Sequence, residues 1–371
     1  MNSYDAIVIG GGIQGCSVAY NLADNGLKVL VLEKDYCGRH ASGVNAGGVR
    51  RLGRDLRELE LSDFSMKEYW HKLDSFLDED CEYEKVPQIK IAMDEEALEF
   101  SKNRVEQVKA MGFEHEQLID TSTLKNFVPD VSDKALGAIL VEDDGHANPF
   151  KTTVAIKHKA IKYGVSIREG EKVLDIKGDD KTSWKVTTDK DVFNAKYIIN
   201  CAGAWGDKIA KMFGEDVPFE AVCLLLSITS KIDLFLKPVI GFQRRALSLK
   251  QFSNGSLMIG GAFKGSLNLE TNETIVDFTQ IARNVSNATE LFPKLKNAKI
   301  VRSWGGIEAI CEDKIPIISK SSKYETVIHN FGYSAHGFQP AFGSGKIVSQ
   351  MLLDQKLSIN NVDEFRINRF V

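Results

Sequence analysis

The chain has 371 residues, 43% of them hydrophobic and 26% charged, with a formal net charge of -4. This length favours two domains, and the slightly acidic charge gives no sign of a nucleic-acid-binding surface. No apolar stretch approaches the roughly twenty residues of a membrane span, and the first residues lack the basic region of a secretory signal. We therefore expect a cytoplasmic globular protein with no membrane span and no nucleic-acid partner.

The spacing of the cysteines and histidines indicates neither a metal site nor a disulfide framework. Six cysteines are scattered without a Cys-x-x-Cys pair, and seven histidines show no His-x-x-x-His spacing. Neither a disulfide framework nor a zinc site is expected from such spacing. We expect reduced thiols and no metal.

The first predicted element is a buried strand that leads into a glycine-rich turn and a helix. Residues 6–9 are apolar without polar alternation, as in a parallel strand that is covered on both faces. A helix is predicted from Ile13 to about Asn25, with Gly26 beyond its end. The turn carries the motif Gly-x-Gly-x-x-Gly, which includes Gly10, Gly12, Ile13, Gln14 and Gly15.

Each glycine of this motif has a physical task. Gly10 permits the tight turn, Gly12 lets backbone amides approach a pyrophosphate, and Gly15 lets the helix pack against the strand. A second strand over residues 29–33 ends at Glu33, whose carboxylate can accept hydrogen bonds from a ribose diol. The alternative is a chance glycine turn, which the spacing of strand, helix and acid disfavours. The motif alone allows either NAD or FAD.

The segment of residues 34–51 is rich in small residues and contains three arginines. Such a stretch cannot form a regular core element, so we expect a loop that is held against a ligand. The alternative is a flexible surface loop.

Helices and strands alternate in the middle of the chain. One long amphipathic helix is predicted over residues 56–77 and another over about 95–111. Asn148 is expected to cap a third helix over residues 149–162, because Pro149 suits the first helical position.

Strands dominate the next part of the chain. Residues 164–176 and 183–193 are predicted to form strands and hairpins, and residues 197–201 form a second buried strand that runs into small residues. Residues 217–301 are expected to form an antiparallel sheet, the floor of a substrate domain. A final helix ends near residue 353.

Two segments in the last third of the chain carry further polar residues. Residues 302–318 include Trp304 and Glu308, and residues 331–346 include His336 in a glycine-rich stretch.

These segments, in this order and spacing, resemble the D-amino-acid oxidase-like (DAO) family of flavoproteins. Within it, residues 41–50 and 144–149 are most similar to the branch of sarcosine oxidase, the L-proline dehydrogenase β-subunit and opine oxidase. The resemblance implies an α/β fold in which a glutathione-reductase-like, FAD-binding Rossmann domain is interleaved with an α+β substrate domain on a mostly antiparallel sheet. The FAD domain would comprise residues 1–82, 149–216 and 318–371, and the substrate domain residues 83–148 and 217–317.

The resemblance also implies a chemistry and a set of cofactor contacts. The expected reaction oxidises the C–N bond of a small amine, N-substituted amino acid or imino acid, with hydride transfer to the flavin and hydrolysis of the imine. The residues that match FAD-contacting positions of the family are Gly10, Gly12, Ile13, Gln14, Gly15, Glu33, Lys34, Arg39, Ser42, Asn45, Ala46, Gly47, Gly48, Val173, Cys201, Ala202, Gly203, Trp205, Gly306, Gly332, His336, Gly337, Phe338 and Gln339.

Three residues are predicted to be catalytic. Arg50 is suited to pair with a substrate carboxylate, because a guanidinium fork fits that geometry; the equal alternative is a surface arginine. His336 lies beside the expected flavin edge, where it polarises substrate or flavin, or is a structural histidine in a turn. Glu308 either meets a substrate cation or is solvated.

Departures from the family pattern refine this prediction. Amino-acid oxidases continue the Trp-x-Gly segment into Leu-Arg-Pro, whose arginine holds the substrate carboxylate, but residues 307–309 here are Ile-Glu-Ala. The lysine with which sarcosine oxidase activates oxygen falls near Met258, and its loss favours a dehydrogenase with another electron acceptor. Gln339 replaces a carboxylate-binding lysine. Asn45 replaces a flavin-linking histidine and Cys311 does not match the linking cysteine, so non-covalent FAD is expected.

The leading hypothesis is an FAD-dependent amine or imino-acid dehydrogenase. One alternative oxidises a C–O bond, as in a 2-hydroxy acid or glycerol 3-phosphate. Another is a flavin-bearing electron-relay subunit of a hetero-oligomer. The sequence leaves the substrate and its stereochemistry, the electron acceptor, the oligomeric state and the need for a partner subunit open.

Overall fold

The N-terminal apolar run forms the central strand of a parallel sheet, as predicted. The computed structural model describes residues 3–370, in which β1 (Ser3–Ile9) pairs in parallel with β2 (Val29–Glu33) and with β12 (Val192–Asn200). The parallel centre of this eight-stranded sheet has the order β9–β2–β1–β12–β21. Its other strands are β9 (Ser166–Glu169), β10 (Val173–Lys177), β11 (Trp184–Thr188), β20 (Ile317–Lys320) and β21 (Val327–Phe331).

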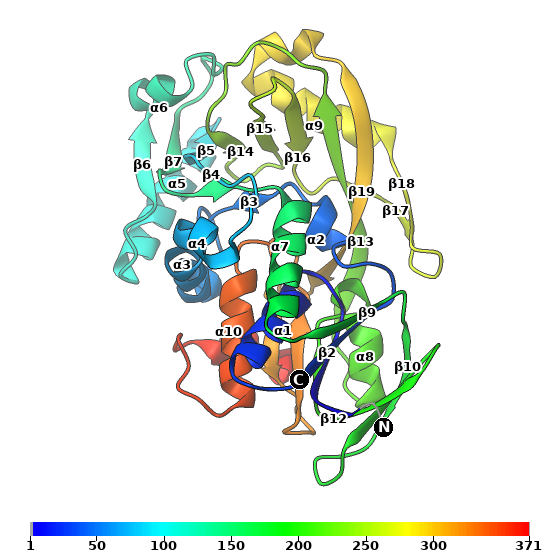
Figure 1. Ribbon diagram of the computed structural model, residues 1–371. Coiled ribbons are helices and arrows are strands. Elements are labelled where there is room, and N and C mark those ends of the chain that lie inside the picture. The colour runs from blue at the N-terminus through cyan, green and yellow to red at the C-terminus, as the bar shows by residue number, and fades with distance from the viewer. Residues whose placement is uncertain (1–2, 371) are drawn as a thin grey trace.

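Both faces of this sheet are covered. Ala6 and Val8 face a hydrophobic cluster that includes side chains of α1 (Ile13–Asp24), α7 (Pro149–Lys162) and α10 (Ala341–Leu352). Ile7 and Ile9 face a second cluster with residues of β10, β11 and α8 (Gly206–Met212). This double burial explains why β1 lacks polar alternation. The sheet and its helices form the lower half of the molecule in Figure 1.

The predicted boundaries of two helices are confirmed. The Asn148 side chain accepts a hydrogen bond from the Lys151 backbone amide at 3.1 Å, and Pro149 is the first residue of α7. The first helix, α1, ends at Asp24, and Gly26 follows with a φ of +85°, a left-handed conformation that suits glycine.

The second large sheet has ten strands and forms the upper half of the molecule in Figure 1. Its pairs are antiparallel except for β14 and β5, which run in parallel. The strands are β5 (Gln88–Ala92), β6 (Gln117–Asp120), β7 (Gly137–Val141), β13 (Phe219–Thr229), β14 (Val239–Phe242), β15 (Ser248–Gln251), β16 (Leu257–Gly260), β17 (Lys264–Asn268), β18 (Glu273–Ile275) and β19 (Ile300–Cys311). Helices α5 (Glu95–Ala110) and α6 (Thr121–Phe127) pack on β5, β6 and β7.

A small three-stranded sheet lies between the two large ones (Figure 1). It joins β3 (Gly48–Val49), β4 (Glu84–Lys85) and β8 (Gly145–His146), and short helix α2 (Ala41–Val44) precedes it. The chain thus crosses several times between the two large sheets. The exact boundaries of the two domains stay a prediction.

The prediction of one long helix over residues 56–77 is wrong. The segment forms a 3-10 turn over Leu56–Glu58, α3 (Leu59–Glu68), a second 3-10 turn and α4 (Leu73–Leu77). The helix is interrupted at Tyr69, where φ is -125° and ψ is -56°. The next residue, Trp70, is fully buried, and its indole N–H donates to the Gln339 carbonyl at 2.6 Å. The amphipathic pattern gives no sign of this long-range bond.

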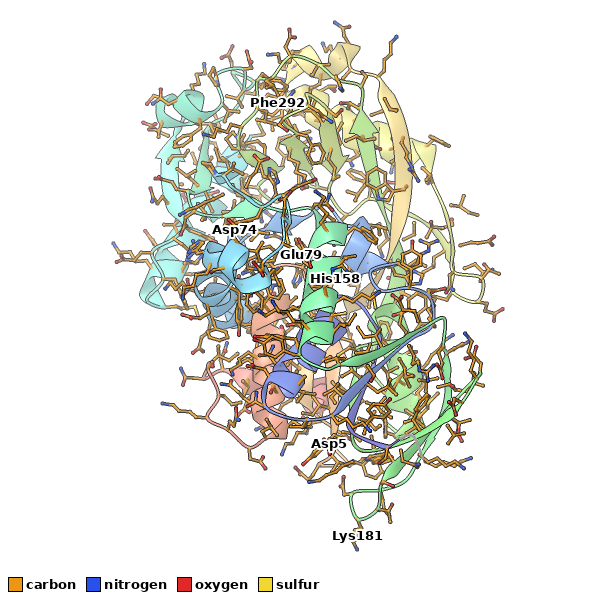
Figure 2. All side chains as sticks on the ribbon, in the orientation of Figure 1. Asp5, Asp74, Glu79, His158, Lys181 and Phe292 are labelled. Atoms are coloured by element: carbon orange, nitrogen blue, oxygen red, sulfur yellow. The ribbon has the colours of Figure 1, made fainter. Side chains whose placement is uncertain are left out.

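The strand-rich prediction for residues 217–301 missed a helix, α9 (Phe278–Leu291). The Asp277 carboxylate caps it by accepting from the amides of Thr279 and Gln280, at 2.8 and 3.2 Å. Its buried face leads to Phe292, a fully buried side chain of the upper core (Figure 2). An N-cap aspartate before helically spaced apolar residues was the available signal.

Three further observations concern residues 3–370. No helix in this range is long and apolar enough to cross a bilayer. No group of three or more histidine, cysteine, aspartate or glutamate side chains there is arranged to hold a metal ion. All six cysteines are buried free thiols.

Candidate active site

A cavity of about 1010 Å³ lies between the two large sheets. Its wall includes the β1–α1 turn and the carboxyl ends of β2 and β12 from one sheet, and parts of β13, β14 and β19 from the other. Ligands of open α/β sheets bind at this carboxyl edge of the strands. The volume lies at the upper end of the range for small-molecule sites, roughly 300–1,000 Å³, which suits a large cofactor.

The glycine turn after β1 brings backbone segments closer together than side chains would allow. Gly10 has a φ of +109°, and a Cβ there would lie 2.4 Å from the carbonyl oxygen of Cys201. A Cβ on Gly15 would lie 1.9 Å from the Gly10 carbonyl oxygen, so only glycine lets α1 pack here. At Gly12, a Cβ would instead fill space on the cavity wall, 2.8 Å from the Ser42 hydroxyl oxygen.

The carboxylate at the end of β2 is fixed by backbone amides. Glu33 Oε2 accepts from the Gly11 amide at 2.7 Å, and Oε1 accepts from the Asp35 amide at 2.8 Å. Burial raises the pKa of Glu33, although these two bonds oppose the shift. A carboxylate has about four acceptor directions, so acceptor capacity remains for a ribose diol. The sequence did not reveal the Gly11 contact.

The side chains of Lys34 and His40 pack against the Trp205 ring at one side of this predicted nucleotide end. The Lys34 ammonium lies 3.2 Å from the centre of the Trp205 ring, and the His40 ring centre lies 4.7 Å from that of Trp205. Lys34 also donates to Asn272 Oδ1 at 2.8 Å, and burial lowers the pKa of Lys34 to about 8. His40 bonds to Asp35 at 2.7 Å. The predicted set of residues omitted His40, which follows directly after Arg39.

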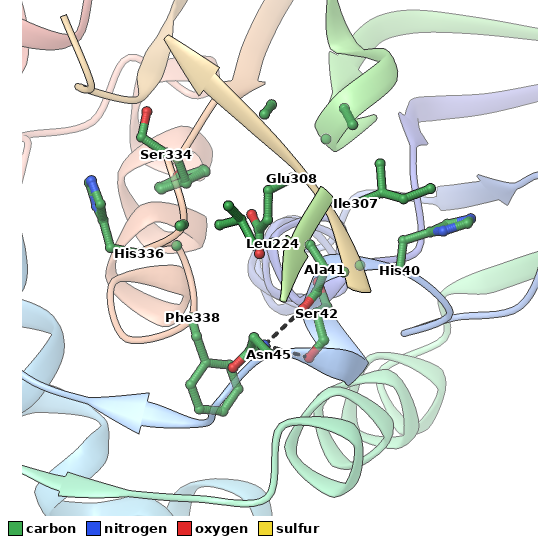
Figure 3. A pocket seen from close by; sticks show the side chains of 18 of the residues that line it. His40, Ala41, Ser42, Asn45, Leu224, Ile307, Glu308, Ser334, His336 and Phe338 are labelled. Atoms are coloured by element: carbon green, nitrogen blue, oxygen red, sulfur yellow. Dashed lines mark hydrogen bonds between the residues drawn. The ribbon is translucent and has the colours of Figure 1, made fainter. Parts of the chain in front are cut away.

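Asn45 holds the shape of the small-residue loop. Its side-chain amide donates to the carbonyls of Ala41 and Ser42 at 2.9 and 3.1 Å (Figure 3). Its Oδ1 accepts from the Gly47 amide at 2.7 Å. Gly47 itself is not part of the cavity wall, because it packs against the Ala147 carbonyl, 2.0 Å from where a Cβ would stand.

The loop before α10 lines the opposite end of the cavity. Ser334 and Ala335 both adopt left-handed backbone conformations, with φ of +51° and +69°, which is strained for residues other than glycine. The Gln14 side chain, from the glycine turn after β1, donates to the Gly337 carbonyl at 2.8 Å and accepts from Asn330 at 3.4 Å. This side chain therefore connects the glycine turn with the loop before α10.

Gln339 lies behind this loop rather than on the cavity wall. It is fully buried, its Nε2 donates to the Ser62 carbonyl at 2.8 Å, and its Oε1 accepts from the Ser62 hydroxyl at 2.9 Å. These bonds tie the loop to α3, so the side chain has no access to the cavity and a direct cofactor contact from it is not supported.

The structure brings nearly all of the predicted cofactor and catalytic residues to the one cavity. Those outside its lining are Gly15, Gly47 and Gln339. The lining contains Gly10, Gly12, Ile13, Gln14, Glu33, Lys34, Arg39, Ser42, Asn45, Ala46, Gly48, Arg50, Val173, Cys201, Ala202, Gly203, Trp205, Gly306, Glu308, Gly332, His336, Gly337 and Phe338. Their individual roles stay predictions.

His336 lies close to a buried carboxylate that no sequence motif marks. His336 Nδ1 is 3.2 Å from Glu58 Oε1, although the two atoms are not aligned as a hydrogen bond. Burial lowers the pKa of His336, and Glu58 opposes that shift. Figure 3 shows His336 on the loop before α10.

Glu308 faces the cavity from β19, opposite Val222 of β13 (Figure 3). Its side chain is half-buried, and the loss of solvation at this position raises the pKa of its carboxyl to about 7. Among residues 3–370, no charged group contributes to that shift. Near neutral pH the carboxyl therefore exists in both protonation states.

Arg50 is also half-buried. It follows β3, lines the cavity, and donates from Nη1 to the Leu52 carbonyl at 2.5 Å. Burial lowers its pKa, while the nearby carboxylates of Asp144, Glu58 and Glu116 oppose the shift.

The parallel sheet, the glycine turn at its carboxyl edge and the acid at the end of β2 define a dinucleotide-binding oxidoreductase of the α/β class. The glycine cradle beside Ser42 and the spare acceptor capacity of Glu33 fit the pyrophosphate and ribose of such a cofactor. The chain belongs to the FAD dependent oxidoreductase family (DAO), whose model matches residues 5–351. It is accordingly an FAD-dependent enzyme, and the predicted family, cofactor and fold class are confirmed.

Relatives of this chain span several named enzymes. It is 25% identical over 383 residues to a subunit of the opine oxidase of Rhizobium meliloti, covering 100% of this chain and 98% of the relative. It is 26% identical over 377 residues to mitochondrial dimethylglycine dehydrogenase of Rattus norvegicus, covering 94% of this chain and 43% of that protein. The chain thus spans less than half the length of that dehydrogenase. The crystal structure of L-proline dehydrogenase from P. horikoshii shares the fold, with a TM-score of 0.90 at 24% identity over 100% of this chain and 98% of that chain.

Proposed function

We propose that this enzyme oxidises the C–N bond of a small N-substituted amino acid or imino acid by hydride transfer to non-covalently bound FAD. The observation that carries the proposal is that two groups of opposite charge, the Arg50 guanidinium and the Glu308 carboxyl, line the same cavity. A zwitterionic amino acid carries the complementary pair, a carboxylate for Arg50 and an ammonium for Glu308. The names of the relatives, which include an opine oxidase subunit and a dimethylglycine dehydrogenase, support the same class of substrate.

Glu308 suits the proton transfer that this reaction needs. An ammonium must lose a proton before hydride can leave the adjacent carbon, because the nitrogen lone pair stabilises the resulting cation. A general base works best when its pKa lies near the operating pH, and burial holds the pKa of Glu308 near 7. The proton passes to a Glu308 carboxylate oxygen, while Arg50 holds the substrate carboxylate and fixes its orientation.

When bound, FAD supplies the acceptor for the hydride and its two electrons. The iminium product then reacts with water to give a carbonyl compound and an amine. His336 lies on the same wall, with its ring beside Glu58; we propose that it contacts the substrate or the flavin ring.

Non-covalent attachment is supported by the position of Cys311. This thiol donates to the Gly332 carbonyl at 3.2 Å and is not part of the cavity lining. Position 45, which carries a linking histidine in the resemblance described above, is an asparagine whose amide is bonded to the backbone.

We further propose that the electron acceptor is a molecule or partner protein other than oxygen. Met258 stands near the position of the oxygen-activating lysine and does not line the cavity. Lys90, a lysine that does line the cavity, belongs to β5 and not to the strand of Met258, β16. The relative that is named as a subunit supports a partner protein as one route for the electrons.

The decisive experiment monitors bleaching of the bound flavin under anaerobic conditions. Purified holoenzyme is mixed with N-methyl amino acids, cyclic imino acids and the corresponding 2-hydroxy acids. We expect bleaching by the amines, and a second series in air, with and without an artificial acceptor, measures peroxide. Bleaching by hydroxy acids alone would contradict the proposed C–N chemistry, and rapid peroxide formation would contradict the proposed acceptor.

A further inference from the structure

The substrate end of the cavity contains a cluster of three cations, Arg50, Arg54 and Lys90, hereafter the cationic cluster. Arg50 and Arg54 belong to the segment after β3, and Lys90 belongs to β5 of the upper sheet; all three line the cavity. Arg54 Nε donates to the Arg50 carbonyl at 3.1 Å, and the Lys90 ammonium packs against Gly53, 2.3 Å from where a Cβ would stand. Burial is the main cause that lowers the pKa of Arg54 to about 9 and that of Lys90 to about 7, and the neighbouring cations add to both shifts.

The carboxylates nearest to the cationic cluster already have other partners. Asp144 accepts from the amides of Arg51 and Leu52, at 2.9 and 3.1 Å, and pairs with the Arg51 side chain. Arg51, next to Arg50 in the chain, points away from the cationic cluster and contacts Asp63 and Asp143 as well.

Two more carboxylates near the cationic cluster are similarly engaged. Glu116 forms a two-pronged pair with Arg104, at 2.9 and 3.0 Å, and accepts from the Gly53 amide at 2.7 Å. Glu58 lies 3.2 Å from His336 Nδ1. No carboxylate in residues 3–370 lies within ion-pair distance of Arg50, Arg54 or Lys90.

Only neutral oxygens hold the two arginines of the cationic cluster. Arg50 donates to the Leu52 carbonyl, and Arg54 donates to the carbonyls of Arg50 and His336 at 3.1 and 2.9 Å. A guanidinium has five N–H donors, so both side chains keep donors for a ligand. The Lys90 ammonium forms no hydrogen bond or ion pair with any other part of the described chain.

Arg54 is buried, and Arg50 and Lys90 are half-buried. Cations that are withdrawn from water without a counter-charge are costly, and in a cavity they are candidates for a ligand site. One carboxylate, held by a single guanidinium fork, would satisfy Arg50 alone. Arg54 and Lys90 are then surplus to a simple amino acid such as glycine or proline. Their presence calls for a second anionic group at the same end of the ligand.

We infer that the enzyme acts on a dicarboxylic N-substituted amino acid, with Arg50 binding one carboxylate and Arg54 and Lys90 binding the other. This inference rests on the proposed function for the reacting C–N bond, but the anion site can be tested without that reaction.

The test uses matched ligands with and without the second carboxylate. Anaerobic flavin reduction is compared for sarcosine, which is N-methylglycine, and iminodiacetate, which is N-carboxymethylglycine. We expect kcat/KM to be at least about tenfold higher for iminodiacetate, mainly through a lower KM. Equal values for the two amines would overturn the inference.

Variants assign the effect to the cationic cluster. Lys90→Gln should reduce the ratio of the two kcat/KM values about tenfold, and Lys90→Arg should restore most of it. Lys250→Gln is the matched control, because Lys250 is a buried lysine of the nearby strand β15 that does not line the cavity. The assignment would be overturned if the ratio fell equally in Lys90→Gln and Lys250→Gln. The content of bound flavin and the Tm show that each variant is folded.

A binding measurement separates the inference from the proposed function. If no amine reduces the flavin, the proposed C–N chemistry fails, but unreactive anions still report on the cationic cluster. Malonate and succinate should then perturb the flavin spectrum of the holoenzyme with a Kd at least about tenfold below that of acetate. Equal affinity for acetate and for both dicarboxylates would overturn the inference.

Discussion

The two ends of the cavity differ in how their polar groups are satisfied. At the nucleotide end the chain supplies its own partners: Glu33 is bonded to the Gly11 and Asp35 amides, and Asn45 to the surrounding loop. At the substrate end, the side chains of Glu308 and Lys90 form no hydrogen bond or ion pair with the described residues, and no charged group there shifts the pKa of Glu308. The chain itself therefore holds the polar groups of the nucleotide end in place, whereas the charged groups of the substrate end have no partner until a ligand binds.

The largest expected effect comes from a substitution in the glycine turn of the nucleotide end. Gly15→Ala places a Cβ 1.9 Å from the Gly10 carbonyl oxygen, so α1 has to move away from β1. We expect loss of bound FAD and a loss of more than about 3 kcal/mol of unfolding free energy. The ratio of flavin to protein absorbance and urea unfolding measure the two effects.

Gly26→Ala is the matched control for that change. Gly26 also has a left-handed φ, of +85°, but nothing lies within 4 Å of an added Cβ. We expect only the backbone strain of about 1–2 kcal/mol, with normal FAD content. Equal loss of FAD in both variants would contradict the assigned role of the turn.

The second prediction compares two adjacent arginines. Arg51 is 3% exposed and contacts three carboxylates, so Arg51→Met leaves buried charges unpaired and should cost about 3–5 kcal/mol of stability. Arg50→Met removes no carboxylate pair, so stability should change by less than about 1 kcal/mol. Its effect should be a KM raised about tenfold or more. Urea unfolding and steady-state kinetics separate the two, and a KM unchanged in Arg50→Met would contradict its role.

The third prediction concerns the isolated carboxyl of the substrate end. Glu308→Gln should lower kcat/KM about a hundredfold with FAD retained, because the amide cannot accept the proton. In the unchanged enzyme the deprotonated carboxylate is the active form, so kcat/KM should rise as pH increases through about 7. The pH dependence of flavin reduction checks this, and a rise that persists in Glu308→Gln would assign it to another group.

The smallest expected effect is an acid sensitivity of the parallel sheet that supports the nucleotide end. Burial alone would raise the pKa of Glu215, but bonds from His329, Ser321 and Ser322 outweigh it and lower the pKa to about 2. His329 in turn contacts Asn200, which precedes the turn after β12.

Because the folded-state pKa lies below the ordinary value of 4.5, ionised Glu215 stabilises the fold at higher pH. That stabilisation is lost as pH falls from about 4.5 towards 2. Urea unfolding between pH 6 and pH 3 measures it, and Glu215→Gln should be less stable at pH 6 and show a smaller pH dependence. An identical slope in both proteins would exclude Glu215 as its source.

The same contrast explains what the sequence could predict. The Gly10 turn, Glu33 and the Asn148 cap depend on residues that are close in the chain, and all three were located correctly in the fold. Helix α9 was missed although its Asp277 cap was visible, because the surrounding strands dominated the interpretation.

Long-range contacts could not be predicted from the sequence. The break at Tyr69 depends on a bond between Trp70 and the Gln339 carbonyl, 269 residues apart. The cationic cluster likewise combines Arg54 with Lys90, and nothing in either local pattern marks a site. Local spacing thus identifies the cofactor end. The substrate end could not be predicted in this way, because it combines residues from distant segments that only the folded structure brings together.

The Gln14 side chain has a consequence for how the cofactor is loaded. It belongs to the turn predicted to meet the pyrophosphate, and it bonds to Gly337 in the strained loop before α10. Filling one end therefore biases the position of the other, which is a coupling free energy between two halves of one ligand. We expect ADP alone to tighten the loop, so that riboflavin binds more strongly in its presence, and by reciprocity ADP binds more strongly when riboflavin is bound.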